Sequence, residues 1–174
     1  MGRDKSRAQV GGHTMLSRVR LAARTAGLRV RVIRKDIVPR CGPIGGIFTA
    51  LKSSHAAVVV IVPCDMPFLV SALIQSAISS LRDSDRAVFT CDGALAGFPC
   101  ALRRDPALTV VERQIARSKF SIQSLAIALR SRLIRPRRKS VGELANINTP
   151  GELQFARQRL RQRPARSNPA RKTA

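Results

Sequence analysis

Residues 56–62 read AAVVVIV, an unbroken run of small and β-branched apolar side chains. A half-exposed strand would alternate apolar and polar residues, so this run is typical of a strand buried on both faces. Strands of that kind belong to parallel sheets that helices cover on both sides. The run therefore predicts an α/β fold with a mainly parallel sheet.

The sequence around this run alternates helix-like and strand-like segments. Residues 28–34 (LRVRVIR) alternate apolar and basic side chains, which predicts another strand. Further strands are expected at residues 86–90, 96–103 and 131–135, and helices at residues 14–26, 45–53, 70–82, 106–117, 121–130 and 150–162. Because ligands of such folds bind beyond the carboxyl ends of the strands, we expect a site in the segments after residues 34 and 62.

The chain is strongly basic, with 32 Lys and Arg against 10 Asp and Glu among 174 residues, a formal net charge of +22. Residues 157–174 are basic and poor in large apolar side chains, so we expect a tail there whose end is disordered. Residues 1–156 then form one folded domain. The charge suggests an anionic partner. Aromatic residues make up only 3% of the chain, which argues against a nucleic-acid partner held by base stacking.

The cysteines stand singly, without the spacing of a metal site; they are Cys41, Cys64, Cys91 and Cys100. We interpret them as reduced thiols of a cytoplasmic protein, mostly in its core. No apolar run approaches the roughly 18 residues that span a bilayer. The charged N-terminus also lacks the apolar core of a secretory signal, so a membrane partner is not expected.

The apolar run leads directly into Pro-Cys-Asp-Met-Pro-Phe at residues 63–68. Asp65 would then lie at the carboxyl end of a strand, at the mouth of the crevice where ligands bind. A carboxylate there suits a Mg²⁺ ion that carries substrate phosphates. A cap for the helix expected from residue 70 explains the same Asp without any ligand.

A glycine-rich loop follows the other expected strand, with Asp36 ahead of Gly42, Pro43, Gly45 and Gly46. The glycines allow close approach of a ligand to the backbone, and the next helix directs its first amides toward an anion. The loop is neither a P-loop nor a dinucleotide-binding fingerprint, and taken alone an ordinary turn is the simpler explanation. Asp36 suits hydrogen bonds from a sugar or base, and it also suits a turn.

Polar residues near the two ends of the domain also suit a substrate. Lys5 would offset charge on a transferring phosphate, although it equally suits the surface. Residues 146–150 read NINTP, and the Thr-Pro pair followed by Glu152 is typical of a helix start. That explanation leaves Asn146 and Asn148 without a role.

The order of these segments along the chain is more specific than any one of them. The segments are Gly2-x-Asp4-Lys5, Asp36 before Gly42-Pro43-Ile44-Gly45-Gly46, Cys64-Asp65-Met66-Pro67-Phe68, Asp92-Gly93 leading to Pro99, and Asn146-Ile147-Asn148-Thr149-Pro150. Over residues 1–157 the chain resembles the molybdenum cofactor guanylyltransferase family. The resemblance implies the Rossmann-like, three-layer α/β fold of the sugar-nucleotide-type nucleotidyltransferases.

The resemblance also implies a reaction, in which the terminal phosphate of molybdenum-bound molybdopterin attacks the α-phosphorus of GTP. GMP is transferred and pyrophosphate leaves. The residues implied for nucleotide binding are Lys5, Asp36, Gly42, Pro43 and Asp65, and those implied for the pterin side are Asn146 and Asn148. Asp65 would bind the Mg²⁺ cofactor and, with Lys5, act in catalysis. The partners would be GTP and molybdopterin as substrates, and molybdoenzymes in transient contact.

The chain departs from the family pattern in three places. The family has a strand and an L-A-G-G-type loop ahead of the Gly-x-Asp-Lys segment, so we expect the first strand of the sheet to be missing here. A start codon placed too late would explain this, and we expect the 174-residue chain to bind GTP poorly. The stretch between Lys5 and Gly42 is shorter than in better-known members, and Phe98-Pro99 stands where His-Pro is common.

Other functions stay open beside guanylyl transfer. One is cytidylyl or another nucleotidyl transfer to a small phosphate, and a second is an inactive truncated remnant. The charge favours a basic nucleic-acid-binding protein, whereas the lack of a recognition motif opposes it.

Overall fold

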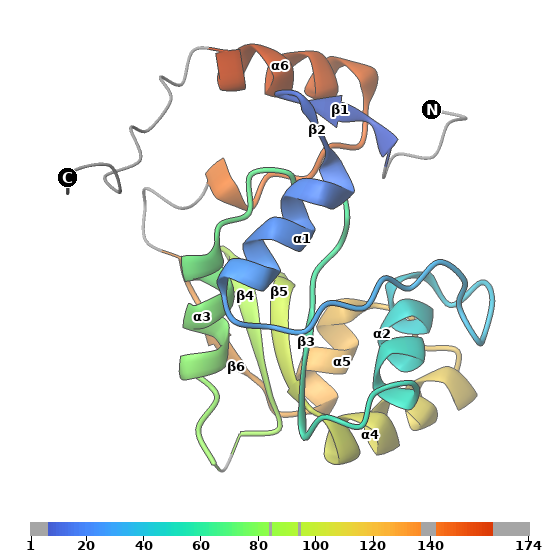
Figure 1. Cartoon of the computed structure of the whole chain (residues 1–174). Helices are drawn as coiled ribbons and strands as arrows, with labels where there is room; N and C mark the ends of the chain where they lie inside the picture. Colours follow the sequence, from blue (N-terminus) through green and yellow to red (C-terminus); the bar gives the residue numbers. More distant parts are fainter. Residues whose placement is uncertain (1–6, 84, 94, 137–141, 162–174) are drawn as a thin grey trace.

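The computed structural model describes residues 7–83, 85–93, 95–136 and 142–161, and it places a β-sheet between two layers of helices (Figure 1). Lys5 and the end of the basic tail lie outside the described residues. None of the helices in the described part of the chain is both long enough and apolar enough to cross a membrane.

The central sheet contains β3 (Val58–Ile61), β4 (Ala87–Asp92), β5 (Leu95–Arg103) and β6 (Arg132–Ile134), in the order β3-β5-β4-β6. β5 runs antiparallel to both β3 and β4, and β6 runs parallel to β4. β3, β4 and β6 therefore point the same way, and β5 opposes them. The expected α/β fold is confirmed, but the described sheet is mixed rather than mainly parallel, because β5 lies between β3 and β4 and runs against both.

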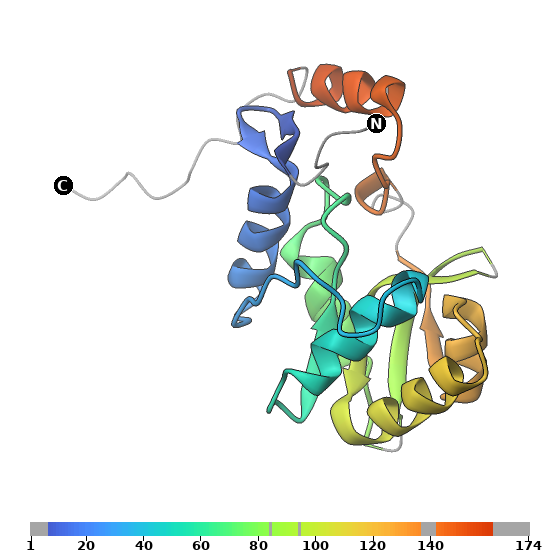
Figure 2. The same ribbon diagram turned by 90° about the vertical axis from the view of Figure 1, so that its right-hand side faces the viewer.

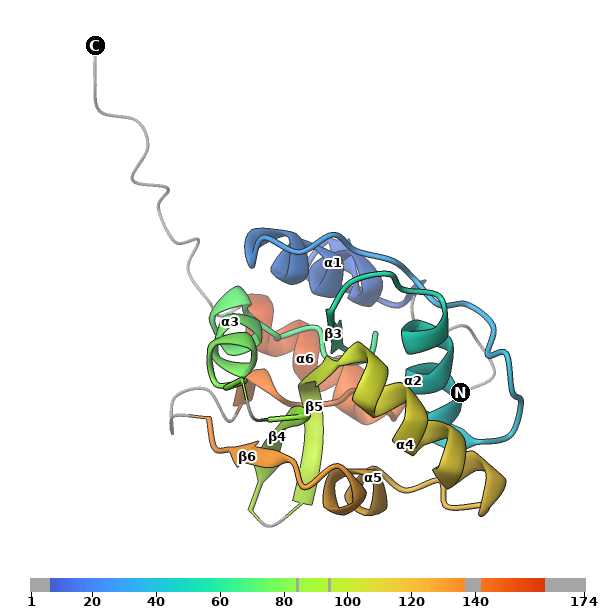
Figure 3. The same ribbon diagram turned by 90° about the horizontal axis from the view of Figure 1, so that it is seen from below.

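One face of the sheet is covered by α2 (Gly42–Lys52), α4 (Arg104–Ala116) and α5 (Ile122–Ala128) (Figure 3). Apolar side chains of these helices meet those of β4 and β5 in the largest core cluster, which contains the fully buried Phe89 and Leu102. Burial of apolar area on this face is the main favourable contribution to folding.

The opposite face is covered by α1 (Met15–Thr25) and α3 (Ser71–Ser79). A smaller apolar cluster lies here, in which Ala22 of α1 and Ile74 of α3 pack beside Val60 of β3. The molecule therefore has the three layers that the resemblance implied.

A third cluster lies near the ends of the chain, where the hairpin of β1 (Gln9–Val10) and β2 (His13–Thr14) meets α6 (Pro150–Arg161) (Figure 2). Its buried members are Val10, Met15, Phe68, Ile147 and Ala156. α6 thus spans residue 156, and it agrees with the helix expected at residues 150–162. The two-residue strands of the hairpin are too short to show any periodicity in the sequence.

The prediction that residues 56–62 are buried on both faces is wrong. All of β3 is half-buried, because β3 is an edge strand of the described sheet. The fully buried strand is β4, where residues 87–91 lie between two neighbouring strands and beneath helices. Apolar side chains favour burial, but the position of a strand in the sheet decides how much of the strand is buried.

The strand predicted at residues 28–34 is also wrong, since the structure assigns no strand there. Leu28 and Val30 are half-buried while Arg29 and Arg31 are exposed, so the alternation that suggested a strand is present. Alternation reports which side chains face the interior, whereas a strand also needs a neighbour with free backbone groups. The other strands and the helices expected from the sequence are present with shifted ends.

Candidate active site

The segment after β3 carries Asp65 along the carboxyl end of the sheet, and contacts from two other elements hold this segment. The Ile147 N–H donates a hydrogen bond to the Asp65 carbonyl at 2.9 Å. From α1, Arg18 Nε donates to the Pro67 carbonyl at 2.9 Å. Residues 63–68 are therefore fixed between the first helix and the chain just ahead of the last one.

The hydrogen bond to Asp65 brings the Asn146–Asn148 segment to the same place. Ile147 is buried in the third core cluster, and both flanking asparagines are exposed. Two of the motifs that the sequence singled out therefore meet in space, although they lie in opposite halves of the chain.

Glu152 holds the backbone of the asparagine segment. Its Oε2 accepts hydrogen bonds from the N–H groups of Asn148 at 2.6 Å and Thr149 at 2.9 Å. The Glu152 N–H donates in return to Thr149 Oγ1 at 3.2 Å, which completes a capping box. The helix start expected here is confirmed, and the same carboxylate that caps α6 also orders the chain at Asn148.

Asp36 lies against the first turns of α2. Its Oδ2 is 3.0 Å from the point where a Cβ on Gly45 would lie, and its Oδ1 is 3.7 Å from the corresponding point on Gly46. The next residue is tied down as well, because the Ile37 N–H donates to Thr49 Oγ1 at 2.9 Å and that hydroxyl donates to the Gly45 carbonyl at 2.8 Å. Gly45 therefore makes room for an acid of the same loop.

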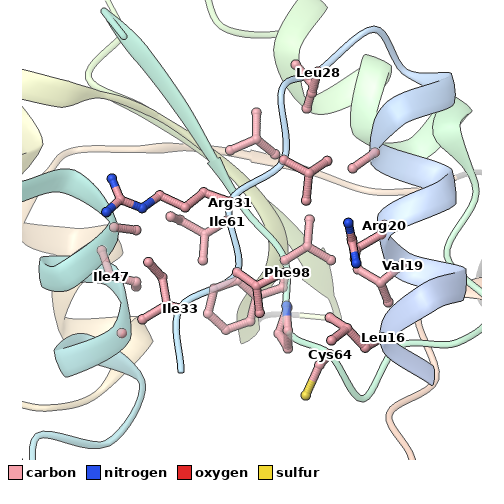
Figure 4. Close-up of a pocket in the computed structure, with 18 of the residues that line it drawn as sticks. Leu16, Val19, Arg20, Leu28, Arg31, Ile33, Ile47, Ile61, Cys64 and Phe98 are labelled. Carbon is pink, nitrogen blue, oxygen red and sulfur yellow. The ribbon is translucent and has the colours of Figure 1, made fainter. Parts of the chain in front are cut away.

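A cavity of about 360 Å³ connects the glycine-rich loop with the segment of Asp65 (Figure 4). Pro43 and Gly46 line it on the side of α2, and Cys64 lines it beside β3. Asp36 and Asp65 are not among the lining residues. The structure thus brings the two loops to one cavity but leaves both carboxylates outside its walls.

The cysteines are free thiols; Cys41, Cys91 and Cys100 are buried and Cys64 is half-buried. The expectation of reduced cysteines, mostly in the core, is met in the described structure. Burial raises the pKa of the Cys100 thiol far above its ordinary value. Cys100 therefore stays protonated and acts as a small apolar core residue.

Asp65 is the expected metal ligand, and its surroundings fit one kind of site. Among the residues that the structure describes, no three His, Cys, Asp or Glu side chains gather as a metal-binding set. Mg²⁺ is commonly held by one or two carboxylates together with substrate phosphates. A carboxylate at the end of a strand suits that arrangement.

Arg18 and Thr49 position the two loops, and the sequence did not single out either. A basic residue in a helix suits solvent, so only the tertiary contact with Pro67 identifies Arg18. Thr49 had a weak signal, because it is a polar residue within the apolar stretch GIFTAL of α2. A buried hydroxyl needs hydrogen-bond partners, and it finds them at Ile37 and Gly45.

Known proteins are similar to this chain in sequence and in fold. The chain is 29% identical over 164 residues to a molybdenum cofactor guanylyltransferase of Xanthomonas euvesicatoria pv. vesicatoria, with 86% of this chain and 84% of the relative covered. Molybdopterin-guanine dinucleotide biosynthesis protein A of Archaeoglobus fulgidus superposes with a TM-score of 0.67 at 18% identity, covering 93% of each chain.

A cytidylyltransferase has a similar fold. The 2-C-methyl-D-erythritol 4-phosphate cytidylyltransferase of Thermus thermophilus superposes with a TM-score of 0.66 at 14% identity, covering 90% of this chain and 93% of its own. The sequence pattern of the MobA-like NTP transferase domain matches residues 20–126, which is more than half of the chain. The protein is therefore a member of the MobA-like NTP transferase family.

Proposed function

We propose that the protein transfers GMP from GTP to molybdenum-bound molybdopterin and releases pyrophosphate. The observation that carries the proposal is the hydrogen bond between Ile147 N–H and the Asp65 carbonyl. It joins the segment expected to bind nucleotide and metal to the segment expected to bind the pterin. The identity with a molybdenum cofactor guanylyltransferase supports the choice of substrates.

The proposed reaction forms one bond and breaks another at the α-phosphorus of GTP. An oxygen of the pterin phosphate attacks that phosphorus, and the bond to the β-phosphate oxygen breaks. In this proposal Asn146 and Asn148 hold the pterin side and the glycine-rich loop at Gly42 and Pro43 shapes the nucleotide side. Asp36 contacts the nucleoside. The task of these groups is to hold both reactants in line, which accounts for much of phosphoryl-transfer catalysis.

Asp65 would hold a Mg²⁺ ion together with the nucleotide phosphates. Bound there, Mg²⁺ would offset the negative charge that develops on the phosphates as pyrophosphate leaves. Lys5, outside the described residues, is proposed to contact the same phosphates.

Cytidylyl transfer is the second candidate, because the fold is equally similar to that of a cytidylyltransferase. The two candidates share the phosphate chemistry and differ in the base. A carboxylate that accepts hydrogen bonds from the base would distinguish them, and Asp36 is the residue proposed for that contact.

The test is a Mg²⁺-dependent assay with molybdopterin and either GTP or CTP, which follows pyrophosphate release and identifies the dinucleotide by mass. Turnover with GTP supports the proposal, and faster turnover with CTP replaces it by the second candidate. Asp65→Asn should lower kcat/KM by about a hundredfold or more, whereas Asp83→Asn, a change at a fully exposed side chain, should not. Lack of turnover with every nucleotide would overturn both candidates for the 174-residue chain and favour the inactive truncated remnant.

A further inference from the structure

The two segments of the proposed site meet at one hydrogen bond, which the Ile147 N–H donates to the Asp65 carbonyl at 2.9 Å. One hydrogen bond sets the distance between two backbone groups but restrains the angle between their chains only weakly, because the directional preference at a carbonyl oxygen is broad. That angle decides how the exposed Asn146 and Asn148 lie relative to Asp65. A second connection between the segments is needed to fix it.

Arg159 of α6 makes this second connection. Its Nη1 donates to the Gly142 carbonyl at 3.0 Å, ahead of the asparagine segment. Its guanidinium carbon lies 4.8 Å from the centre of the Phe68 ring, at the end of the segment that carries Asp65. The ring is buried in the third core cluster together with Ile147, and Arg159 is half-buried. A cation over an aromatic ring is held more strongly when both are withdrawn from water.

Gly142 shows that the guanidinium has a specific place. A Cβ on Gly142 would lie 2.6 Å from Arg159 Nη2 and 3.0 Å from Nη1. The first distance is shorter than a Cβ tolerates, so the guanidinium occupies space that only a glycine leaves open. Gly151, in the first turn of α6, differs in this respect, because a Cβ there would meet no other part of the described structure within 4 Å.

These contacts join the two segments of the site at both ends. One segment runs from Asp65 to Phe68, and the other runs from Gly142 through Ile147. The hydrogen bond between Ile147 and Asp65 connects them at one end, and Arg159 connects them at the other. Two chains that are joined at two points cannot turn about either point, so their relative orientation is fixed.

We propose that Arg159 is a positioning residue for the nucleotidyl transfer, which holds the pterin-side segment at a fixed angle to the segment of the metal and the nucleotide. The inference rests on the function proposed above. In this proposal Arg159 contacts neither substrate, because each segment carries its own binding groups. It acts on the alignment of the pterin phosphate with the α-phosphorus of GTP, and a misplacement of about 1 Å lowers a rate by up to about a hundredfold.

Arg159→Met tests the proposal, because it removes the guanidinium and keeps most of the apolar stem. In the assay of pyrophosphate release, kcat should fall by about tenfold or more, while the KM values for GTP and molybdopterin change by less than about threefold. Arg159→Lys keeps a cation over the Phe68 ring and should recover part of the lost rate. Arg161→Met removes an exposed charge from the end of the same helix and should keep the kcat of the parent.

The split between kcat and KM separates positioning from a purely structural role. If Arg159 only stabilised α6, Arg159→Met would lower the Tm and leave kcat unchanged at temperatures where the variant is folded. Circular dichroism gives the Tm of each variant, and the assays are run well below it. An unchanged kcat in the folded variant, or a change confined to the KM values, would overturn the proposal.

Gly142→Ala is a second variant, which tests the connection even where Arg159→Met does not fold. It displaces the guanidinium without removing it, and the displaced atoms are the far end of a flexible side chain. We expect kcat to fall as in Arg159→Met, and the double variant to be no slower than the slower single variant, since both changes break one connection. Gly151→Ala is the matched control and should keep the kcat of the parent. Losses that multiply in the double variant would show that Gly142 and Arg159 act separately, against the proposal.

Amide hydrogen exchange without substrates separates failure of this inference from failure of the proposed function. Exchange at the Ile147 N–H should be faster in Arg159→Met and in Gly142→Ala than in the parent, and unchanged in Gly151→Ala. A parent chain without turnover overturns the proposed function, and exchange at Ile147 still decides whether Arg159 holds the two segments together. Exchange that Arg159→Met leaves unchanged would overturn the inference whatever the activity of the parent.

Discussion

At the scale of single residues, the candidate site depends on space and on a few hydrogen bonds. A Cβ on Gly45 would lie 3.0 Å from Asp36 Oδ2 and 3.0 Å from the Val38 carbonyl oxygen. A Cβ on Gly46 would lie 3.7 Å from Asp36 Oδ1, which is ordinary van der Waals contact. The surroundings of Gly45 therefore exclude a side chain, whereas those of Gly46 leave space for a Cβ.

Gly45→Ala should lower the free energy of unfolding by about 1–3 kcal/mol, because the backbone at Val38 and the Asp36 side chain must both move. Under the proposed function the KM for the nucleotide should rise as well. Gly46→Ala is the matched control, and it should raise stability by up to about 1 kcal/mol, since alanine favours a helix interior. Urea unfolding measures both variants, and equal effects of the two changes would contradict this account of Gly45.

A second prediction concerns the ion pair of Asp85 with Arg132, whose Nε lies 2.8 Å from Asp85 Oδ2. The hydrogen bond from Arg132 and that from the Arg82 N–H hold the pKa of Asp85 below its ordinary value. A lowered pKa stabilises the fold above the unfolded value of about 3.9, and the contribution is lost as the pH falls through the folded pKa.

Asp85→Asn should therefore lower the free energy of unfolding near neutral pH, and the difference from the parent should shrink in acid. Denaturant unfolding over a series of pH values measures it. Asp83→Asn serves as the control, because Asp83 is fully exposed in its pair with Arg103 and exposed pairs contribute little. The difference in the free energy of unfolding between Asp85→Asn and the parent could instead stay constant down to strong acid. That result would show that the charge of the Asp85 carboxylate does not stabilise the fold.

At the scale of elements, α6 connects the candidate site to the N-terminal hairpin. Arg157 Nε donates to the Gln9 carbonyl at 3.0 Å. Arg159 donates to the Gly142 carbonyl at 3.0 Å, and its guanidinium lies 4.8 Å from the centre of the Phe68 ring. The position of α6 therefore influences the segment of Asp65 from one side and the asparagine segment from the other.

Glu152→Ala should lower the free energy of unfolding by about 1 kcal/mol through loss of the capping box. It also frees the N–H groups of Asn148 and Thr149, so the KM for the pterin substrate should rise more than the KM for the nucleotide. Gln154→Ala, at an exposed position of the same helix, is the control and should change neither. Equal changes in both KM values would argue against a place for this segment on the pterin side.

At the scale of the whole molecule, the feature that needs a physical account is the net charge of +22. GTP and a pterin phosphate are both polyanions, and a positive field raises the rate at which such substrates meet the protein. The same field is screened by salt, with a Debye length of about 10 Å at 0.1 M and about 3 Å at 1 M. Charge and proposed function are thus linked by a measurable salt dependence.

Raising the salt concentration should lower kcat/KM for GTP several-fold and leave kcat nearly unchanged, because the field acts on encounter rather than on the bound complex. Steady-state kinetics over a salt series measures this effect. Sucrose at equal osmolality is the control and should not reproduce it. A kcat/KM that does not change with salt would show that the basic surface has another purpose.

The outcome for particular elements shows what a sequence can predict here. The helices were predictable because side chains spaced three and four residues apart report a buried face locally. The capping of α6 was predictable for the same reason, since Thr149, Pro150 and Glu152 act on one helical turn. The contacts of Arg18 with Pro67 and of Ile147 with Asp65 join distant segments, and no local pattern reports them.

The sequence alone determined the fold class, the order of the motifs and the family resemblance, because each depends on residue types and their spacing. The tertiary structure decided which apolar run becomes the buried strand. Residues 56–62 and 28–34 both have strand-like patterns. The first contains a half-buried edge strand, and the second pairs with no strand in the part of the chain that the structure describes. Strand pairing depends on which backbone groups a distant neighbour leaves free, and that is a property of the assembled sheet.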